Sequence, residues 1–505
     1  MRIEIMDTTL RDGEQTSGVS FSPTEKLSLT RILLTELRVP RIEIASARVS
    51  EGERESVRKV CSWASRVGML ERIEILGFID QGKSIEWIKS VGGTVINMLA
   101  KGSERHCRLQ LKKTPEQHFA DVRNEVMLAT ENGLSVNLYL EDWSNGIKGG
   151  QQYVYNMMDA LIDLPIRRFM LPDTLGILNP NQVYEYCKRM VTRYPNVHFD
   201  FHAHNDYDLA TSNAFAAGLV GVKGLHCTVN GLGERAGNAP LSSVVAVVHD
   251  MLKMSTDIDE TKINKVSHIV ESFSGITVPP NKPIVGESVF TQCAGVHADG
   301  DNKNNLYYND LLPERFGRER EYALGKTSGK ANIKKNLEAL GIELSEDDVK
   351  KVTQRVIELG DKKEIVTPEE LPYIVADVLK HDMGQHKVKI INYALSVSLG
   401  LKPTATIKMQ INGNEYERTS TGDGQYDAFV RAIRKIYKEE LKRHFPMLTN
   451  YVVSIPPGGR TDSLVLTTTT WEYNGHQIKT RGLDAGQIEA AIQATLKMLN
   501  LIENL

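Results

Sequence analysis

The chain has 505 residues, of which 25% are charged, and its formal net charge is −3 at pH 7. This length exceeds what one hydrophobic core fills and indicates about three domains. The near-neutral charge gives no electrostatic reason to expect nucleic acid or an anionic membrane as a partner.

Export signals and disulfides are not expected either. The N-terminus lacks the basic and apolar regions of a signal peptide. No uninterrupted apolar run approaches the ~20 residues that span a bilayer. The five cysteines are scattered without a CxxC pair, which is typical of reduced thiols. These observations predict a cytoplasmic protein.

Eight short apolar runs rich in β-branched residues recur through the first half, and each is expected to be a strand. They cover residues 3–6, 41–45, 73–77, 95–99, 136–140, 168–171, 198–201 and 222–228. Helical periodicity lies between them, for example over 22–37, 114–132, 151–162 and 181–194. Eight strand-then-helix units favour an α/β fold with a (β/α)8 TIM barrel over residues 1–277. A doubly wound sheet is the alternative, but no Gly-x-Gly-x-x-Gly follows a strand.

Two further regions follow the barrel. A polar segment over 278–326 is too long for a passive linker. With a helical stretch over 330–379, it is expected to form linker subdomains within 278–386. From 387 to 505, strand patterns (388–397, 404–411, 463–471) mix with helical ones (425–441, 484–499) and predict a separate α+β domain.

Chemically active side chains close two of the strands. Asp12 follows the first strand, and His202 and His204 close the seventh, where alternation puts both imidazoles on one side. One carboxylate and two imidazoles, with the amide oxygen of Asn238, suit Mn²⁺, Zn²⁺, Co²⁺ or Mg²⁺. A His-x-His pair alone is more often packed or surface histidine. The carboxylate that follows the first strand, together with Asn205 and Asp206 beside the histidines, favours a metal site.

Other strand ends and a glycine-rich run complete the expected site. Leu76, Leu99, Tyr139, Glu141 and Thr174 are expected at the carboxyl ends of strands, where TIM barrels carry their active sites. Residues 230–238, Asn-Gly-Leu-Gly-Glu-Arg-Ala-Gly-Asn, include three glycines that allow close approach to a ligand. A tight turn would explain the glycines but not the charged residues beside them.

These motifs resemble those of the acyl-CoA-condensing metalloenzymes, the family of 2-isopropylmalate, homocitrate and citramalate synthases. The resemblance rests on residues 7–15 (Asp-Thr-Thr-Leu-Arg-Asp-Gly-Glu-Gln), 202–206 (His-Ala-His-Asn-Asp) and 230–238, and it extends to 281–286, 295–300, 325–329 and 422–424. It covers essentially the whole chain. It implies an acyltransferase that joins the methyl carbon of acetyl-CoA to the ketone of a 2-oxo acid and releases CoA.

The resemblance also implies roles for the barrel residues. Asp12, His202, His204 and Asn238 would hold a divalent metal. Arg11 would contact the substrate and stabilise the developing alkoxide, as a fixed cation does for any oxyanion.

Further roles follow for residues around the metal. Glu141 would be the general base or hold it. His297 and Tyr307 would assist proton transfer, and Asn305 would contact substrate, although an ordinary polar linker is the alternative for all three. Gln292 and Cys293 stand where many relatives of the isopropylmalate type carry histidine and serine, which weakens that assignment.

The pocket wall decides the substrate. Leu76, Leu99 and Tyr139 would form a bulky, apolar wall that accepts a methyl group and crowds an isopropyl group, and Thr174 would also contact the substrate. This favours pyruvate, with (R)-citramalate on the route to isoleucine as the product. A 2-isopropylmalate synthase of leucine biosynthesis is the alternative.

The region from 387 resembles the effector-binding domain of these synthases, which implies a homodimer and feedback by an amino acid, here isoleucine. Gly422, Asp423, Gly424 and Tyr426 are the candidate effector contacts, and a dimerisation domain without a ligand is the alternative. A lyase or aldolase of the same barrel class and a non-enzymatic amino-acid sensor are the rival functions.

Overall fold

The computed structural model describes residues 2–301, 306–307, 309–361, 366–379, 387–454, 465–474 and 476–504. The chain divides into two compact units. The first comprises Met1–Phe290 and Tyr308–Arg320, and the second comprises Thr291–Tyr307 and Glu321–Leu505.

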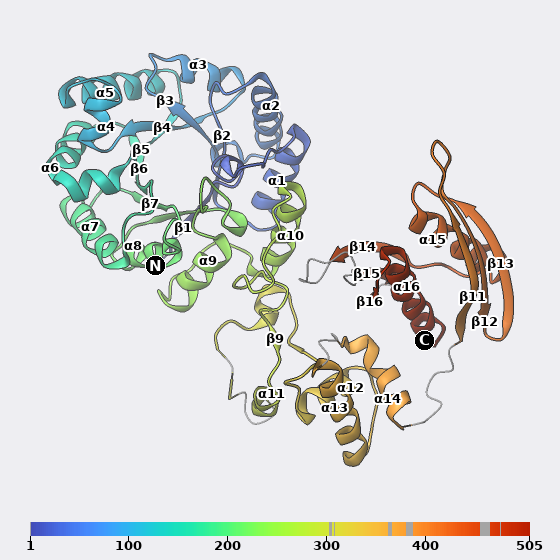
Figure 1. The fold of residues 1–505 in the computed structure, drawn as a ribbon. Coiled ribbons are helices and arrows are strands. Elements are labelled where there is room, and N and C mark those ends of the chain that lie inside the picture. Colours follow the sequence, from blue (N-terminus) through green and yellow to red (C-terminus); the bar gives the residue numbers. More distant parts are fainter. Residues whose placement is uncertain are drawn as a thin grey trace. The chain divides into compact units, whose positions relative to one another are not determined.

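The first unit is a closed barrel of eight parallel strands, seen as the ring of blue to green ribbons in Figure 1. Its strands are β1 (Glu4–Asp7), β2 (Arg41–Ser46), β3 (Ile73–Phe78), β4 (Val95–Lys101), β5 (Ser135–Glu141), β6 (Ile166–Asp173), β7 (Phe199–Ala203) and β8 (Gly224–Cys227). Pairing of β8 with β1 closes the barrel. The TIM-barrel prediction is confirmed, and each strand lies within two residues of its expected bounds.

Helices surround the barrel. They are α1 (Pro23–Thr35), α2 (Glu51–Arg66), α3 (Lys83–Ser90), α4 (Glu104–Leu109), α5 (Pro115–Glu131), α6 (Trp143–Leu161), α7 (Pro180–Arg193), α8 (Ala210–Leu219), α9 (Leu241–Asp250) and α10 (Ile263–Ser274). Ser22, Thr114 and Asn179 each open a helix with a capping box and a proline in the first turn. The helix expected over 151–162 begins earlier, at Trp143, because two helical pieces meet at Gly150.

The barrel interior combines apolar and charged layers. Apolar residues of strands and helices form one large core around the strands, and burying each such side chain stabilises the fold by roughly 1.5–3 kcal/mol. Inside the barrel, Met6, Leu76, Tyr139 and Met170 form a separate small cluster against which Leu99 packs. Arg41, also buried, pairs with carboxylates on other strands.

The second unit begins with short elements around a helical core. The strands β9 (Thr291–Gln292) and β10 (Glu321–Tyr322) pair, and the helices are α11 (Gly295–Asp301), α12 (Lys330–Ala339), α13 (Glu346–Asp361) and α14 (Leu371–Leu379). Packing of Ile333, Val352 and Leu371 holds the helical part together. Helix α11 was not predicted, because a helix of seven residues shows no clear periodicity.

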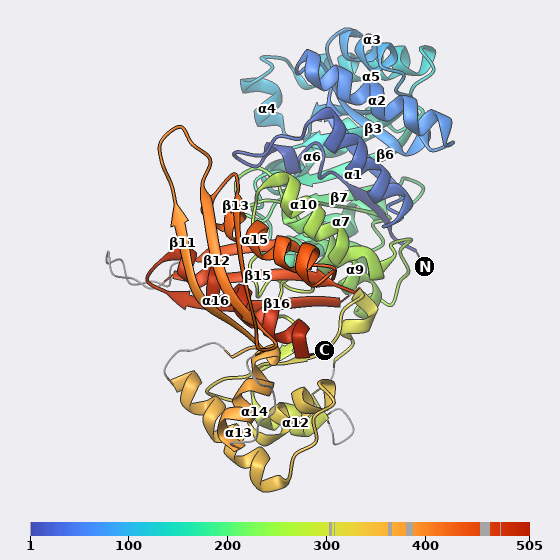
Figure 2. The ribbon, with the colours of Figure 1, turned by 90° about the vertical axis from the view of Figure 1, so that its right-hand side faces the viewer.

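The C-terminal part of this unit repeats a pattern of three antiparallel strands and a helix, shown in orange and red in Figure 2. Its elements are β11 (Val388–Ser396), β12 (Thr404–Ile411), β13 (Asn414–Thr421), α15 (Gln425–Lys435), β14 (Met447–Ser454), β15 (Val465–Tyr473), β16 (His476–Asp484) and α16 (Gln487–Asn504). A π-helical turn, Ile436–Glu440, continues α15. The expected α+β character is confirmed.

Two sequence expectations can be compared with the described residues directly. All five cysteines are free thiols, and four of them are buried. Among the described residues, no helix combines the length and apolar content needed to cross a membrane.

Candidate metal-dependent active site

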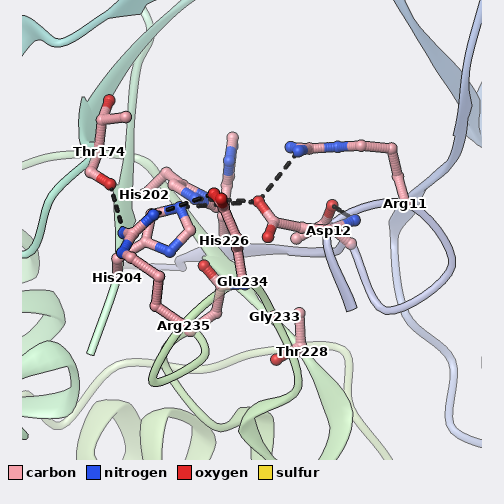
Figure 3. A network of polar contacts seen from close by, with 12 residues as sticks. Arg11, Asp12, Thr174, His202, His204, His226, Thr228, Gly233, Glu234 and Arg235 are labelled. Carbon is pink, nitrogen blue, oxygen red and sulfur yellow. Dashed lines mark hydrogen bonds and ion pairs between the residues drawn. The ribbon is translucent and has the colours of Figure 1, made fainter. Parts of the chain in front are cut away.

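Asp12, His202 and His204 meet at the carboxyl ends of β1 and β7 (Figure 3). The Asp12 Oδ2 atom lies 3.5 Å from His202 Nε2 and 3.9 Å from His204 Nε2. All three side chains are buried. The two histidines share a side of β7 because residues two apart in a strand point the same way. The structure thus brings together the three predicted ligands from opposite ends of the barrel sequence.

The charges in this cluster suit a cation. Burial would raise the pKa of Asp12, but Arg11, His202 and His204 lower it below its usual value. Burial lowers the pKa of both histidines, and Asp12 opposes this effect in each. The carboxylate is therefore anionic and the imidazoles neutral near pH 7, which is the protonation state that a metal requires of its ligands.

Buried polar atoms without a hydrogen-bond partner also indicate a cation site. The Nδ1 atoms of His202 and His204 and the Oδ1 atom of Asn238 are buried without a hydrogen-bond partner among the described residues. Such atoms cost free energy unless a ligand or water satisfies them. The residues present therefore fit a divalent metal.

Asn238 reaches the cluster through the loop between β8 and α9. Its backbone forms a bridge with His204, and Ala239 N–H donates to the Ala203 carbonyl at 3.1 Å. Gly233, with φ +153°, makes room for the amide, since a Cβ there would lie 2.1 Å from Asn238 Nδ2. Gly233 is thus needed for Asn238 to reach the site.

Arg11 is fixed beside the cluster by two carboxylates. Its Nη1 atom lies 3.0 Å from Asp12 Oδ2, and its Nε donates to Glu43 Oε2 at 2.5 Å. Burial would lower the pKa of Arg11, but Glu43 and Asp12 raise it above its usual value. Glu43 also accepts hydrogen bonds from Thr8 and Asn97. Sequence reasoning gave Glu43 no role, although an acid within the apolar run of β2 was an available signal.

A cavity of about 250 Å³ opens above these residues. It is lined by Arg11, Asp12, Gln15, Ser46, Leu76, Phe78, Leu99, Tyr139, Glu141, Pro172, Thr174, His202, His204 and Glu234. Every barrel residue predicted to contact substrate lies in this lining. Gln15, Ser46, Phe78, Pro172 and Glu234 were not predicted as contacts, since a linear sequence does not show which residues in loops and at strand ends face the cavity.

Glu141 and Thr174 have partners that bear on their predicted roles. The Glu141 carboxylate forms an ion pair with Lys101 at the end of β4. The Thr174 hydroxyl accepts a hydrogen bond from Asp142 N–H at 2.9 Å, and its carbonyl accepts one from Arg235 at 2.8 Å (Figure 3). Lys101 compensates the charge of Glu141, and Thr174 is held in place.

The remaining predicted residues belong to the second unit. The rings of His297 and Tyr307 pack against each other at 4.4 Å between centroids. Asn305 lies outside the described residues. The turn of Gly422, Asp423 and Gly424 precedes α15, and Asp423 is paired with Lys402 and Arg431.

Tyr426 lies on α15, one residue into the helix. Its hydroxyl meets the hydroxyl of Thr495 on α16 at 2.7 Å, and its ring packs against Phe429 and Tyr451. Tyr426 thus joins the two strand-and-helix repeats of this unit.

An eight-stranded parallel barrel with an Asp–His–His cluster at the carboxyl ends of its strands defines a TIM barrel equipped to bind a divalent metal. The chain belongs to the HMGL-like family, whose model matches residues 2–270. The model of the homocitrate synthase post-HMGL domain matches 284–364, and that of the LeuA allosteric (dimerisation) domain matches 365–503.

Relatives with two different names resemble the chain to the same degree. A putative (R)-citramalate synthase of Methanopyrus kandleri is 33% identical over 87% of this chain and 84% of its own. A probable 2-isopropylmalate synthase of the same organism is 34% identical over 99% of this chain and 98% of its own. The (R)-citramalate synthase of Methanocaldococcus jannaschii is 32% identical over the full length of both chains.

Proposed function

We propose that this protein condenses acetyl-CoA with pyruvate to (R)-citramalate and CoA, the first step of the pyruvate route to isoleucine. The observation that carries the proposal is the Asp12–His202–His204 cluster at the base of a cavity walled by Leu76 and Tyr139. In this proposal, the protein consists of a catalytic barrel over 1–277, linker subdomains over 278–386 and a regulatory domain over 387–505.

The barrel residues have separate tasks in this reaction. Asp12, His202, His204 and Asn238 hold a divalent metal, one of Mn²⁺, Zn²⁺, Co²⁺ and Mg²⁺. When bound, this ion supplies a Lewis acid next to the ketone and carboxylate of the oxo acid. Arg11, fixed by Glu43, presents its guanidinium to the oxygen that becomes negative.

Glu141 removes a proton from the acetyl methyl group or holds the base that does so. Its ion pair with Lys101 keeps the carboxylate at the cavity, within reach of a bound substrate. Roles of His297 and Tyr307 in proton transfer, and of Asn305 in substrate contact, rest on the family resemblance alone.

The cavity wall supports pyruvate as the oxo acid. Leu76, Leu99 and Tyr139 form an apolar surface that is backed by Met6 and Met170, so larger substituents would have to displace packed side chains. Among the described lining residues, the one lysine or arginine is Arg11, which two carboxylates already hold. A second, distal carboxylate on the substrate would therefore find no free cation.

A 2-isopropylmalate synthase is the second candidate, because relatives with that name are as similar to the chain as the citramalate synthases. An apolar pocket discriminates one extra methylene by only ~1–3 kcal/mol. The preference for pyruvate over 2-oxoisovalerate therefore depends on how rigidly Leu76, Leu99 and Tyr139 are held.

A substrate panel tests the proposal. The full chain, loaded with Mn²⁺, is assayed for thiol release from acetyl-CoA with pyruvate, 2-oxobutyrate and 2-oxoisovalerate. We expect the highest kcat/KM with pyruvate. Higher turnover with 2-oxoisovalerate would favour the second candidate, and absence of thiol release with all three would point to a lyase or a sensor.

The assembly and location of the protein complete the proposal. The match to the LeuA allosteric (dimerisation) domain supports a homodimer with an amino-acid effector site. Isoleucine is the expected effector, and the cytoplasm is the expected location.

A further inference from the structure

A chain of buried hydrogen bonds leads from the barrel interior to the cavity wall. The Tyr139 hydroxyl lies 3.1 Å from His226 Nδ1, and His226 Nε2 lies 3.0 Å from Asp200 Oδ2. Asp200 in turn pairs with Arg41, whose Nη2 lies 2.5 Å from the same carboxylate oxygen. Each of the four residues is at most 3% exposed. Of the four, Tyr139 alone lines the cavity.

The direction of these hydrogen bonds follows from the charges. A carboxylate held by an arginine only accepts, so His226 Nε2 carries the hydrogen that it donates to Asp200. With Nε2 as the donor to Asp200, Nδ1 is the ring nitrogen that is left to accept from the Tyr139 hydroxyl, 3.1 Å away. The hydroxyl hydrogen of Tyr139 therefore points into the barrel interior and away from the cavity.

Ring contacts fix the same side chain from two directions. The Tyr139 ring meets the His226 ring edge-on, with centroids 5.6 Å apart and planes at 84°. It meets the His202 ring at 6.2 Å and 88°. Met6 and Met170 pack behind the ring. To admit a larger substituent, Tyr139 would have to leave a buried hydrogen bond and two ring contacts together.

We propose that His226 is a specificity-positioning residue: by accepting the hydroxyl hydrogen of Tyr139, it holds that ring across the cavity and limits the size of the oxo acid. The inference rests on the proposed function, because the cavity must take a 2-oxo acid for the limit to act. His226 touches no substrate itself and acts through Tyr139.

A matched pair of amide variants separates the two ends of His226. In His226→Asn, the side-chain oxygen takes the place of Nδ1, so the acceptor for Tyr139 is kept and the link to Asp200 is lost. In His226→Gln, the amide takes the place of Nε2, so the link to Asp200 is kept and the acceptor is lost. Tyr139→Phe removes the hydroxyl from the other side, and His268→Asn, exposed on α10, is the control.

The readout is the ratio of kcat/KM for pyruvate to kcat/KM for 2-oxobutyrate, measured on the Mn²⁺-loaded full chain. We expect this ratio to fall roughly tenfold in H226Q and Y139F, mainly through a lower KM for 2-oxobutyrate. It should stay within about threefold of wild type in H226N and H268N. Affinity for Mn²⁺ should not change in H226Q, which separates loss of positioning from damage to the neighbouring His202.

The outcomes distinguish the inference from the proposed function. Wild-type turnover with an unchanged ratio in H226Q and Y139F would overturn the inference alone, as would equal losses in H226N and H226Q. No turnover of any oxo acid by wild type would overturn both. If H226Q does not fold, as its thermal midpoint would reveal, Y139F carries the test. A ¹⁵N NMR spectrum that shows Nδ1 of His226 protonated would also overturn the inference.

Discussion

The charged side chains at the site are each compensated by a neighbouring side chain. Asp12 is the centre of this arrangement, because Arg11 and both histidines face its carboxylate. Glu43 compensates Arg11 from the opposite side, so the guanidinium is neither free to leave nor bound to Asp12 alone. A buried ion pair of this kind is expensive to break, since the remaining charge is left without a partner.

Replacing Asp12 with Asn tests its role as metal ligand. The amide keeps the size of the side chain but removes the negative charge that faces both histidines. We expect affinity for Mn²⁺, measured by titration with electron paramagnetic resonance detection, to fall at least about 100-fold, with a similar loss of thiol release. Asp163→Asn, in the exposed turn after α6, is the control. Unchanged Mn²⁺ affinity in D12N would remove Asp12 from the ligand set.

Some of these residues could be assigned a function from the sequence, and others could not. Asp12, His202 and His204 could be predicted because the two histidines interrupt an apolar pattern at the end of the seventh strand, and Asp12 lies in the charged run after the first. Glu43 and His226 interrupt strands as well, but their functions depend on which strand lies beside them. Only the closed barrel shows that β2 delivers Glu43 to Arg11 and that β8 delivers His226 to Tyr139.

At the scale of elements, the loop between β8 and α9 carries Asn238, the proposed fourth metal ligand, and also closes the barrel. It is fixed at both ends: Asn238 bridges to His204, and the Thr16 hydroxyl accepts a hydrogen bond from Gly233 N–H at 2.8 Å. Its glycine content was visible in the sequence. Which glycine makes room for which side chain was not, because that depends on a contact across the loop.

Replacing Gly233 with Ala should therefore damage the metal site. The new methyl group would meet Asn238 Nδ2, and the φ of +153° disfavours any side chain at this position. We expect at least a tenfold loss of Mn²⁺ affinity and of kcat/KM with pyruvate, on the scale seen when the groups that orient a metal ligand are removed. Gly52→Ala, where a Cβ meets no atom closer than 3.9 Å, serves as the matched control. Equal behaviour of the two variants would contradict this account of the loop.

The contact between α5 and β4 should make the free energy of unfolding depend on pH. His118 on α5 is buried, and its Nε2 accepts a hydrogen bond from Lys101 N–H at 3.1 Å. Burial lowers the pKa of His118 from 6.5 to about 4. Between these values the unfolded chain binds a proton that the folded chain does not. The free energy of unfolding therefore decreases as the pH falls from about 6.5 to about 4, and it is recovered above that range.

His118→Gln should reduce this pH dependence, because the amide oxygen can still accept from Lys101 but does not titrate. Between pH 7 and pH 5, we expect wild type to lose about 2 kcal/mol more than H118Q. Urea unfolding of both proteins at the two pH values measures the difference. Parallel losses in both proteins would show that His118 is already protonated in the folded state or exposed to water.

Strands of the second unit illustrate where element prediction fails. β12 alternates cleanly between apolar and polar residues and was predicted at its observed bounds. β13 was missed, because seven of its eight residues are exposed or half-buried and its sequence, Asn-Glu-Tyr-Glu-Arg-Thr-Ser-Thr, has no apolar face. β14 and β16 were missed as well. Such strands are specified by their pairing with β12 and β15, which no local pattern records.

For the whole molecule, the proposed chemistry and the proposed regulation fall in different units. Every residue of the metal cluster and cavity lies in the first unit. The match to an allosteric domain lies entirely within the second. A change confined to the effector site should therefore alter inhibition while turnover without effector stays the same. A non-enzymatic sensor would show the effector response without thiol release.

Isoleucine is expected to inhibit thiol release more strongly than leucine, and Asp423→Asn should weaken that inhibition. Asp423 is 73% exposed at the turn before α15 and carries a charge that can meet an ammonium group. Loss of a hydrogen bond to a charged group reduces affinity roughly tenfold or more. We therefore expect the isoleucine concentration for half inhibition to rise by that factor in D423N, with kcat and KM for pyruvate unchanged in its absence. The exposed Asp347 of α13, changed to Asn, is the control. Stronger inhibition by leucine would instead favour the leucine pathway and, with it, 2-oxoisovalerate as the substrate.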